Sequence, residues 1–263
     1  MPVDVVICSK DREALCWAQI AQIRKKIPHG RIIVVDGSEQ PYDLDGVVHL
    51  SMPNIKLGPA RNMGLEHVET PETLVLDDDL IYGPTFYATL SKHLNSSKEV
   101  AAVSGMVQWG YPDHKTMMRL HSNPRSIGHS GGCALFKTDI LKKLGGYHPE
   151  MHRGEDSELF YRLRKHGYKW LRVPEPVGHP CTVRQYLTRN MHNPEGIIET
   201  WKSGSAPIAE ILARRTLRPL IMPFYYAWKA RDVKVYPLYF ASSFIYAFYS
   251  WHYFLNGWRR WLE

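Results

Sequence analysis

The most informative stretch of the chain is Leu74-Val75-Leu76-Asp77-Asp78-Asp79, in which an apolar run ends in three acidic residues. The apolar run predicts a buried strand, and open α/β sheets bind their ligands beyond the carboxyl ends of the strands. Alternation along an extended backbone places Asp77 and Asp79 on the same side. Two carboxylates so close repel each other unless a cation lies beside them, and carboxylate oxygens suit Mg²⁺ or Mn²⁺. The triplet therefore predicts a metal site that would hold a diphosphate. The alternative is a solvated acidic turn.

Strand-like and helix-like patterns alternate on both sides of this stretch. Short apolar runs predict strands, and apolar spacing of three and four residues predicts helices between them. The strands are expected at residues 3–7, 31–35, 47–50, 73–76, 101–107, 131–136 and 170–173, and the helices at 13–26, 59–68, 84–94, 138–144 and 156–166. This order predicts βαβ units and therefore an α/β fold with a mainly parallel sheet. Residues 108–127 are expected to form a long functional or mobile loop.

Composition divides the chain into a body and a tail. The tail, residues 206–263, holds 16 of the 31 aromatic residues and a net charge of +5 out of a total of +7. The body, residues 1–205, is close to neutral and has the composition of a soluble globular domain. Because the positive charge of a nucleic-acid binder should follow its functional domain, no nucleic-acid partner is expected.

The tail contains a long uncharged segment, residues 235–258, with basic residues on both sides. A helix of that length reaches about 36 Å, enough for a hydrocarbon core of about 30 Å. Its Ser, His and Asn residues make it polar for a span, whereas its Tyr and Trp content is typical of the membrane interface. We expect the tail to associate with a membrane, either lying on it or crossing it once at 235–258. The alternative is a buried helix pair or a contact between copies of the chain in a homo-oligomer.

Further motifs surround the acidic triplet in a fixed order. Asp36-Gly37-Ser38 and Asn54-x3-Gly58-x2-Arg61-Asn62-x-Gly64 precede it, and Gly131-Gly132-x-Ala134-x-Phe136-Lys137, Gly145-Gly146-Tyr147 and Gly154-Glu155-Asp156 follow it. This succession resembles the family 2 glycosyltransferases, inverting enzymes with the GT-A fold, over about residues 3–180. The resemblance implies a GT-A catalytic domain at 1–205 that binds a nucleotide-sugar donor, followed by a helical membrane-association region at 206–263.

The resemblance assigns three residues to the nucleotide. Asp36 matches the carboxylate that contacts the base or ribose, and Ser9 lies where that family lines the nucleotide pocket. Arg61 matches a helix arginine near the donor. The alternative for Asp36 is a turn-capping role. The alternative for Arg61 is a salt bridge on a solvated helix face.

The resemblance also assigns the metal site. Asp77 and Asp79 match the DxD pair of the family, and Asp78 between them would face the ribose. His179 follows the last predicted strand, where related enzymes often place a third ligand, and its imidazole suits Mn²⁺ better than Mg²⁺. The alternative for His179 is a structural role.

On the acceptor side, Asp156 matches the general base of the family. Inversion by direct displacement needs a base opposite the leaving nucleotide, to take the proton of the acceptor hydroxyl. Asp156 begins a predicted helix, whose dipole favours an ionised carboxylate. Glu155, Gly131 and Gly132 match the same side of the site. The alternative for Asp156 is a helix N-cap.

A narrower resemblance is to the dolichyl-phosphate-sugar and cellulose-synthase-like branches. It implies metal-dependent transfer of one sugar, mannose or glucose, from a GDP- or UDP-linked donor to a lipid-linked acceptor. The enzyme would be bound to the membrane with its catalytic domain on the cytoplasmic side. The stretch from Gln185 to Asn190 differs from the Gln-x-x-Arg-Trp signature of the cellulose-synthase-like branch by one extra residue and by lacking the Trp. Processive polymer synthesis is therefore not expected.

Two other functions are weighed against this one. A sugar-1-phosphate nucleotidyltransferase has a similar core but needs a glycine-rich loop after the first strand, and residues 7–12 contain no glycine. A non-catalytic nucleotide-binding or scaffold protein at a membrane surface would not require Asp156.

Overall fold

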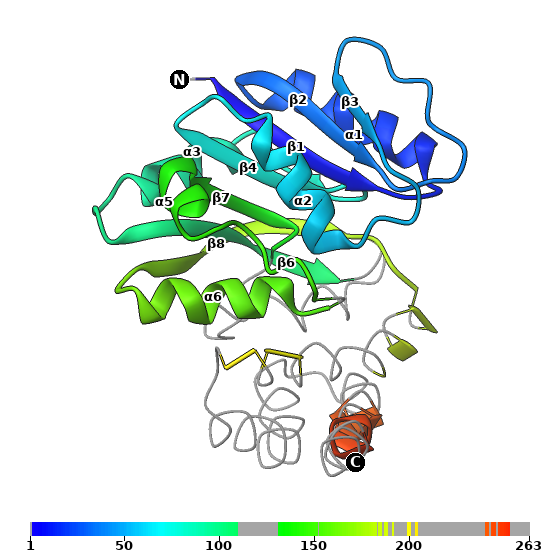
Figure 1. Cartoon of the computed structure of the whole chain (residues 1–263), viewed down its shortest axis with the longest axis vertical. Helices are drawn as coiled ribbons and strands as arrows, with labels where there is room; N and C mark the ends of the chain where they lie inside the picture. Colours follow the sequence, from blue (N-terminus) through cyan, green and yellow to red (C-terminus); the bar gives the residue numbers. More distant parts are fainter. Residues whose placement is uncertain are drawn as a thin grey trace.

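Strands and helices alternate along most of the chain in the computed structural model (Figure 1). The structure describes residues 2–109, 131–151, 153–182, 184–185, 187–188, 191, 199–200, 203–204, 240–241, 243–245 and 247–252. The elements are β1 (Val3–Ser9), α1 (Glu13–Lys26), β2 (His29–Asp36), β3 (Val48–Ser51), α2 (Leu57–Glu66), β4 (Glu72–Asp77), β5 (Ile81–Tyr82), α3 (Phe86–Leu94), β6 (Val100–Trp109), β7 (Cys133–Lys137), α5 (Thr138–Lys143), α6 (Glu155–Lys165) and β8 (Lys169–His179).

These strands form one sheet in the order β3-β2-β1-β4-β7-β6-β8-β5. The four strands from β3 to β4 are mutually parallel, which confirms the parallel pairing expected for the first half of the chain. β7 is antiparallel to both of its neighbours, β4 and β6. β8 is parallel to β6, and β5 is antiparallel to β8. The sheet is therefore mixed, and β7 interrupts its parallel order next to the acidic triplet.

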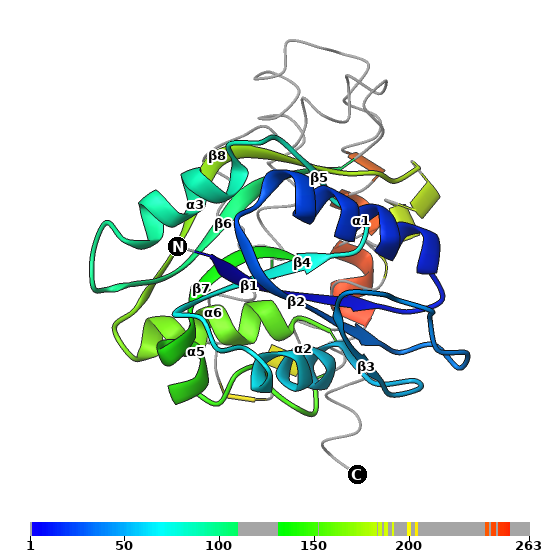
Figure 2. The same cartoon turned by 90° about the horizontal axis from the view of Figure 1, so that it is seen from above.

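Helices cover both faces of the sheet (Figure 2). α1 and α3 lie on the face to which Val5 and Ile7 of β1 point, and these residues share one apolar core with them. α2, α5 and α6 lie on the other face and share a second core with Val6. A strand covered on both faces is apolar at successive positions rather than at alternate ones. This explains why the central strands appear in the sequence as continuous apolar runs.

Most predicted elements are present with shifted ends, and one prediction is too short. The last strand, expected at 170–173, continues to His179 through Pro174 and Pro176. Proline removes a backbone donor and usually excludes a residue from a central strand. Here the pairing of β6 with β8 is irregular between Ser104 and Met106, where Met106 stands opposite Pro176. β5 was not predicted, and its two residues are too few for a pattern.

Only part of the predicted tail lies within the described residues. The positions described between 240 and 252 are helical, and Phe240, Phe244, Phe248 and Trp251 expose 45–63% of their surface. Among the described residues, no helix has both the length and the apolarity needed to cross a bilayer. The boundary predicted at 205/206 and nearly all of the loop predicted at 108–127 lie outside the described residues.

Candidate active site

Parallel strands bring the first three predicted site residues to one edge of the sheet. Ser9 at the end of β1 stands opposite Asp36 at the end of β2. On its other side β1 pairs with β4, where Cys8 stands opposite Asp77. The carboxyl ends of neighbouring parallel strands are where open α/β sheets hold their ligands. The edge therefore gathers the residues that the resemblance assigns to the nucleotide and the metal.

β7 begins at this edge because it runs antiparallel to β4. The Asp77 N–H donates to the Gly132 carbonyl at 2.8 Å, so the residue before β7 lies against the end of β4. A β-carbon on Gly132 would be 2.0 Å from Asp77 Oδ2, far inside van der Waals contact. The absence of a side chain at Gly132 is therefore what allows the Asp77 carboxylate to occupy its place.

The adjacent glycine makes the corresponding contact with the acceptor-side acid. The Gly131 N–H donates to Asp156 Oδ2 at 3.2 Å, and a β-carbon on Gly131 would be 2.6 Å from Asp156 Cβ. Asp156 is the second residue of α6, which begins at Glu155 after Gly154 in the left-handed conformation (φ 76°). The Ser157 N–H donates to Asp156 Oδ1 at 2.7 Å. The predicted base is thus fixed by backbone donors at a helix N-terminus.

Arg61 of α2 connects the two sides of the site. Its Nη2 lies 3.2 Å from Asp77 Oδ1, and its Nη1 lies 2.6 Å from Glu155 Oε1. The guanidinium also lies over the Tyr147 ring, 5.2 Å from its centroid, and only 3% of Arg61 is exposed. Burial raises the pKa of Glu155, whereas Arg61 opposes the rise. Arg61 does form a salt bridge, but on a buried helix face and not on the solvated one that the alternative expected.

The other two acids of the triplet are buried under a second arginine. Asp78 accepts a hydrogen bond from Ser9 Oγ at 2.6 Å, and Arg12 Nη1 lies 2.8 Å from its other oxygen. Arg12 Nη2 donates to Asp79 Oδ2. Burial raises the pKa of Asp78 to about 6, with Ser9 and Arg12 opposing the rise and Asp79 and Asp77 adding to it. The predicted contact of Asp78 with a ribose stays a prediction.

His179 is brought to the acidic triplet from the far half of the sheet. It is the last residue of β8 rather than a residue after it. Its Nε2 lies 3.3 Å from Asp79 Oδ1 and 4.0 Å from Asp77 Oδ2. The structure therefore brings together the three residues that were predicted as metal ligands.

The fit of this trio to a divalent cation can be tested on its geometry. No group of three or more His, Cys, Asp or Glu side chains is arranged to hold a metal ion within the part of the chain that the structure describes. The donor chemistry is nevertheless suitable, because two carboxylates and an imidazole suit Mn²⁺. Asp79 Oδ1 is buried and accepts no hydrogen bond from the described residues, and its contact is with His179 Nε2 at 3.3 Å. The residue types thus suit a divalent metal ion, and the side chains would have to move to complete its coordination geometry.

Asp36 makes the contacts of a turn cap. One oxygen accepts from the Ser38 N–H at 2.9 Å and the other from the Tyr42 N–H at 2.8 Å, and the residue is fully buried. His49 Nε2 lies 3.5 Å from the second oxygen. Burial alone would raise the pKa of Asp36, but the hydrogen bonds from Ser38, Tyr42 and His49 outweigh it and lower the pKa. The turn-capping role that was the alternative for Asp36 is observed, and its contact with a nucleotide stays a prediction.

Sequence reasoning gave no role to three residues of this site. Arg12 covers the triplet, Tyr42 accepts the Arg12 N–H and pairs with Ser9, and Tyr147 lies beneath Arg61. Tyr147 stands in the Gly-Gly-Tyr motif, which is the one signal that could have identified it. Arg12 and Tyr42 belong to no motif.

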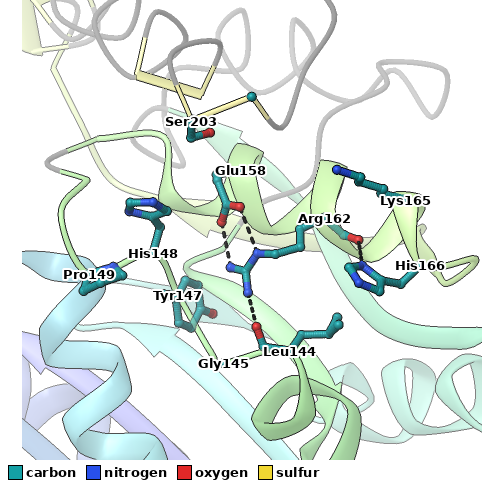
Figure 3. A pocket seen from close by; sticks show the side chains of 11 residues that line it. Leu144, Gly145, Tyr147, His148, Pro149, Glu158, Arg162, Lys165, His166 and Ser203 are labelled. Carbon is teal, nitrogen blue, oxygen red and sulfur yellow. Dashed lines mark hydrogen bonds and ion pairs between the residues drawn. The ribbon is translucent and has the colours of Figure 1, made fainter.

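A separate cavity of about 440 Å³ lies on the other side of α6 (Figure 3). Its lining comes from residues 144–149, from α6 and from the turn at Ser203 and Gly204. Arg162 in its wall is fixed by Glu158 and by the carbonyls of Leu144 and Gly146. None of the acidic triplet, Asp156 or His179 lines this cavity. The candidate site is therefore the carboxylate cluster at the sheet edge, and not this cavity.

Comparison with known proteins identifies the family and the fold of the chain. A family model described as "Glycosyltransferase like family 2" matches residues 1–202. No curated protein sequence matches the chain. Among solved structures, the mannosyltransferase PcManGT from Pyrobaculum calidifontis, in complex with GDP-Man and Mn²⁺, superposes with a TM-score of 0.69. The match has 16% identity and covers 97% of this chain and 87% of that one.

Two further solved structures share the fold at 16% identity. GalNAc-T7 with UDP, GalNAc and Mn²⁺ gives a TM-score of 0.57, covering 82% of this chain and 54% of that one. Glucosyl-3-phosphoglycerate synthase from Mycobacterium tuberculosis, in complex with phosphoglyceric acid, gives 0.54, covering 78% and 81%. At this identity the likeness shows the GT-A fold alone. Because the family model covers most of the chain, the protein belongs to the glycosyltransferase-like family 2 and is a glycosyltransferase.

Proposed function

We propose that the protein is a metal-dependent, inverting glycosyltransferase that moves one hexose from a nucleotide-diphosphate sugar to a lipid-linked acceptor. The observation that carries the proposal is the Gly131-Gly132 dipeptide. Gly132 contacts Asp77 of the donor side, and Gly131 donates to Asp156 of the acceptor side. A base and a metal-binding acid held by adjacent residues are what a direct displacement between two bound substrates requires.

Asp77, Asp79 and His179 are the residues that would hold the metal ion. When bound, Mn²⁺ or Mg²⁺ would supply positive charge to the departing diphosphate. The support for this set is that His179 Nε2 lies 3.3 Å from Asp79 Oδ1 and 4.0 Å from Asp77 Oδ2, and that Asp79 Oδ1 is buried. Mn²⁺ is the first metal to test, because the complexes of PcManGT and GalNAc-T7 contain it.

Asp156 is the proposed general base. Its carboxylate is half-buried, held by the N–H groups of Gly131 and Ser157, and aligned with the positive end of the α6 dipole. This environment orients the carboxylate to take the proton of an acceptor hydroxyl. Attack from the side opposite the nucleotide then inverts the configuration at the sugar carbon. Glu155, paired with Arg61, fixes the start of α6 and thereby positions Asp156.

The donor is proposed to be GDP- or UDP-linked mannose or glucose, and the acceptor is proposed to be lipid-linked. GDP-mannose should be tested first, because it is the donor bound in the PcManGT structure. The aromatic and basic tail supports a membrane-held acceptor, since enzyme and acceptor would meet at the interface. The catalytic domain would then lie on the cytoplasmic side, where nucleotide sugars are the expected donors of this branch.

The decisive experiment compares Asp156→Asn with the native protein. Loss of the base should lower turnover of the donor with Mn²⁺ and a lipid phosphate acceptor by about 10²- to 10⁴-fold. Thermal stabilisation by GDP or UDP should be unchanged, because Asp156 lies on the acceptor side. Asp139→Asn is the matched control, since Asp139 is an exposed acid in the first turn of α5. Native turnover by Asp156→Asn would contradict the proposed base, and turnover unaffected by EDTA would contradict the metal.

A further inference from the structure

The acidic triplet carries an internal counter-ion in Arg12. This residue is the N-cap of α1, and its guanidinium contacts Asp78 through Nη1 at 2.8 Å and Asp79 through Nη2. The Arg12 side chain is 43% exposed, whereas those of Asp78 and Asp79 are 3% and 8% exposed. The Arg12 side chain therefore lies between two buried carboxylates and the solvent. The backbone of Arg12 is fixed, because its N–H donates to the Tyr42 hydroxyl at 2.7 Å.

Arg12 contacts the carboxylate of Asp79, which is one of the proposed metal ligands. Of the two oxygens of the proposed ligand Asp79, Oδ2 is bound to Arg12, and Oδ1 is buried 3.3 Å from His179 Nε2. A cation that binds both oxygens of Asp79 needs the position beside Oδ2 that the Arg12 guanidinium occupies. A divalent ion and Arg12 would therefore compete for Asp79.

The two arginines of the site differ in how firmly they are held. Arg61 is 3% exposed and is fixed by Asp77, by Glu155 and by the Tyr147 ring. The ion pairs of the Arg12 side chain among the described residues are with Asp78 and Asp79, and the side chain is 43% exposed. Arg12 can thus move away at the cost of those two contacts, whereas Arg61 cannot move without opening the core.

We infer that Arg12 is a displaceable counter-ion that neutralises Asp78 and Asp79 in the metal-free protein and yields Asp79 to the divalent cation. The inference rests on the proposed metal dependence and adds a positioning residue to it. It explains how Asp78 and Asp79 can be buried side by side, because Arg12 supplies a positive charge to both carboxylates. It also assigns Arg12 a position beside the diphosphate, where a released guanidinium would meet the phosphate oxygens.

The test is a Mn²⁺ titration without nucleotide, in which free Mn²⁺ is followed by its paramagnetic resonance signal. Arg12→Gln removes the competing cation and should bind Mn²⁺ about tenfold more tightly than the native protein, as expected when one charge-assisted contact no longer competes. Arg12→Lys keeps the charge but not the two-pronged contact and should bind with intermediate affinity. The melting temperature of Arg12→Gln should fall without Mn²⁺ and recover with it.

The matched control is Arg31→Gln. Arg31 is 41% exposed and pairs with Glu69 near the opposite end of β2 from Asp36, so its loss should leave Mn²⁺ affinity unchanged. Equal or weaker Mn²⁺ binding by Arg12→Gln would overturn the inference. It would indicate that Arg12 supports metal binding or has no influence on it, and does not compete with the metal. Tighter Mn²⁺ binding with no turnover of any donor would leave the counter-ion role intact and contradict the proposed function instead.

Discussion

Arg61 and Glu155 form an ion pair inside the protein, with Nη1 2.6 Å from Oε1, although 94 residues separate them in the chain. The pair joins α2 to the N-terminus of α6, and Arg61 extends the connection to Asp77 at the end of β4. A buried ion pair gains little over apolar packing, yet breaking it by removing one partner is costly. Its main effect here is to fix the position of α6, and therefore of Asp156, relative to the donor side.

Replacing Arg61 should show this cost directly. Arg61→Met leaves Glu155 as an uncompensated buried carboxylate and should lower the free energy of unfolding by about 3–5 kcal/mol, measured by urea denaturation. Adding Glu155→Gln should restore part of the loss. Lys169→Met is the control, because its pair with Glu99 is about 60% exposed and should contribute little to stability. An equal, small effect of both single changes would show that the buried pair is not a structural requirement.

Gly132 should not tolerate a methyl group. In Gly132→Ala the new carbon would lie 2.0 Å from Asp77 Oδ2, so the carboxylate or the start of β7 must move. A displacement of about 1 Å in such a site can lower turnover by about 10²-fold. Gly83→Ala is the control, since a β-carbon there would meet nothing nearer than 3.8 Å. The turnover of the two variants is compared by steady-state kinetics. Near-native turnover by Gly132→Ala would refute the close contact between Gly132 and the Asp77 carboxylate.

Asp36 should stabilise the protein only while it is ionised. Its pKa is lowered in the folded state by the hydrogen bonds from Ser38, Tyr42 and His49, which outweigh its burial. Because the pKa of Asp36 is lower in the folded state than in the unfolded state, its ionisation stabilises the fold. This stabilisation is complete above the unfolded pKa of about 4 and is lost as the pH falls through the folded pKa. Asp36→Asn should therefore be less stable than the native protein at pH 5, where Asp36 is ionised. The difference should narrow below about pH 4, and a difference that widens there would contradict the assigned contacts.

The exposed aromatic residues of the tail should contribute to membrane binding. Phe240, Phe244 and Phe248 recur every four residues, which places them on one face of a helix, and each is at least half exposed. Changing all three to Ser should reduce co-sedimentation with anionic lipid vesicles by about tenfold or more. Leu15, Met52 and Ile81 are exposed to a similar extent in the sheet domain and provide the control triple change. Unchanged vesicle binding by the Phe variant would remove the support for an interfacial tail.

The sequence allowed the sheet edge to be predicted because strand ends are set by local pattern. The apolar run before Asp77 and the glycine pair before β7 each identify one end of a strand, and neighbouring strand ends meet at one edge. His179 was placed near the triplet only through the family resemblance. Its strand passes through Pro174 and Pro176, which a sequence pattern assigns to a loop.

The contacts that the sequence could not predict depend on three-dimensional packing. The sequence around Arg61 is the same whether its partner is solvent or a glutamate 94 residues later, so burial could not be inferred. Arg12 covers the triplet because the N-terminus of α1 lies beside the end of β4, and no motif encodes that proximity. For Asp36 the Asp-Gly-Ser stretch fits both a turn cap and a ligand contact, and only the hydrogen bonds show which is made.

The antiparallel direction of β7 affects how far apart Asp77 and Asp156 are held. Asp77 is anchored to the carbonyl of Gly132 and Asp156 to the amide of Gly131, so the two acids are attached to consecutive residues. Consecutive Cα atoms are about 3.8 Å apart across a planar linkage that resists twisting. The peptide bond between Gly131 and Gly132 thus helps to set the distance from the backbone at the end of β4 to the carboxylate of Asp156. Insertion or deletion of one residue at this point should be far more damaging than most side-chain changes in the surrounding loops.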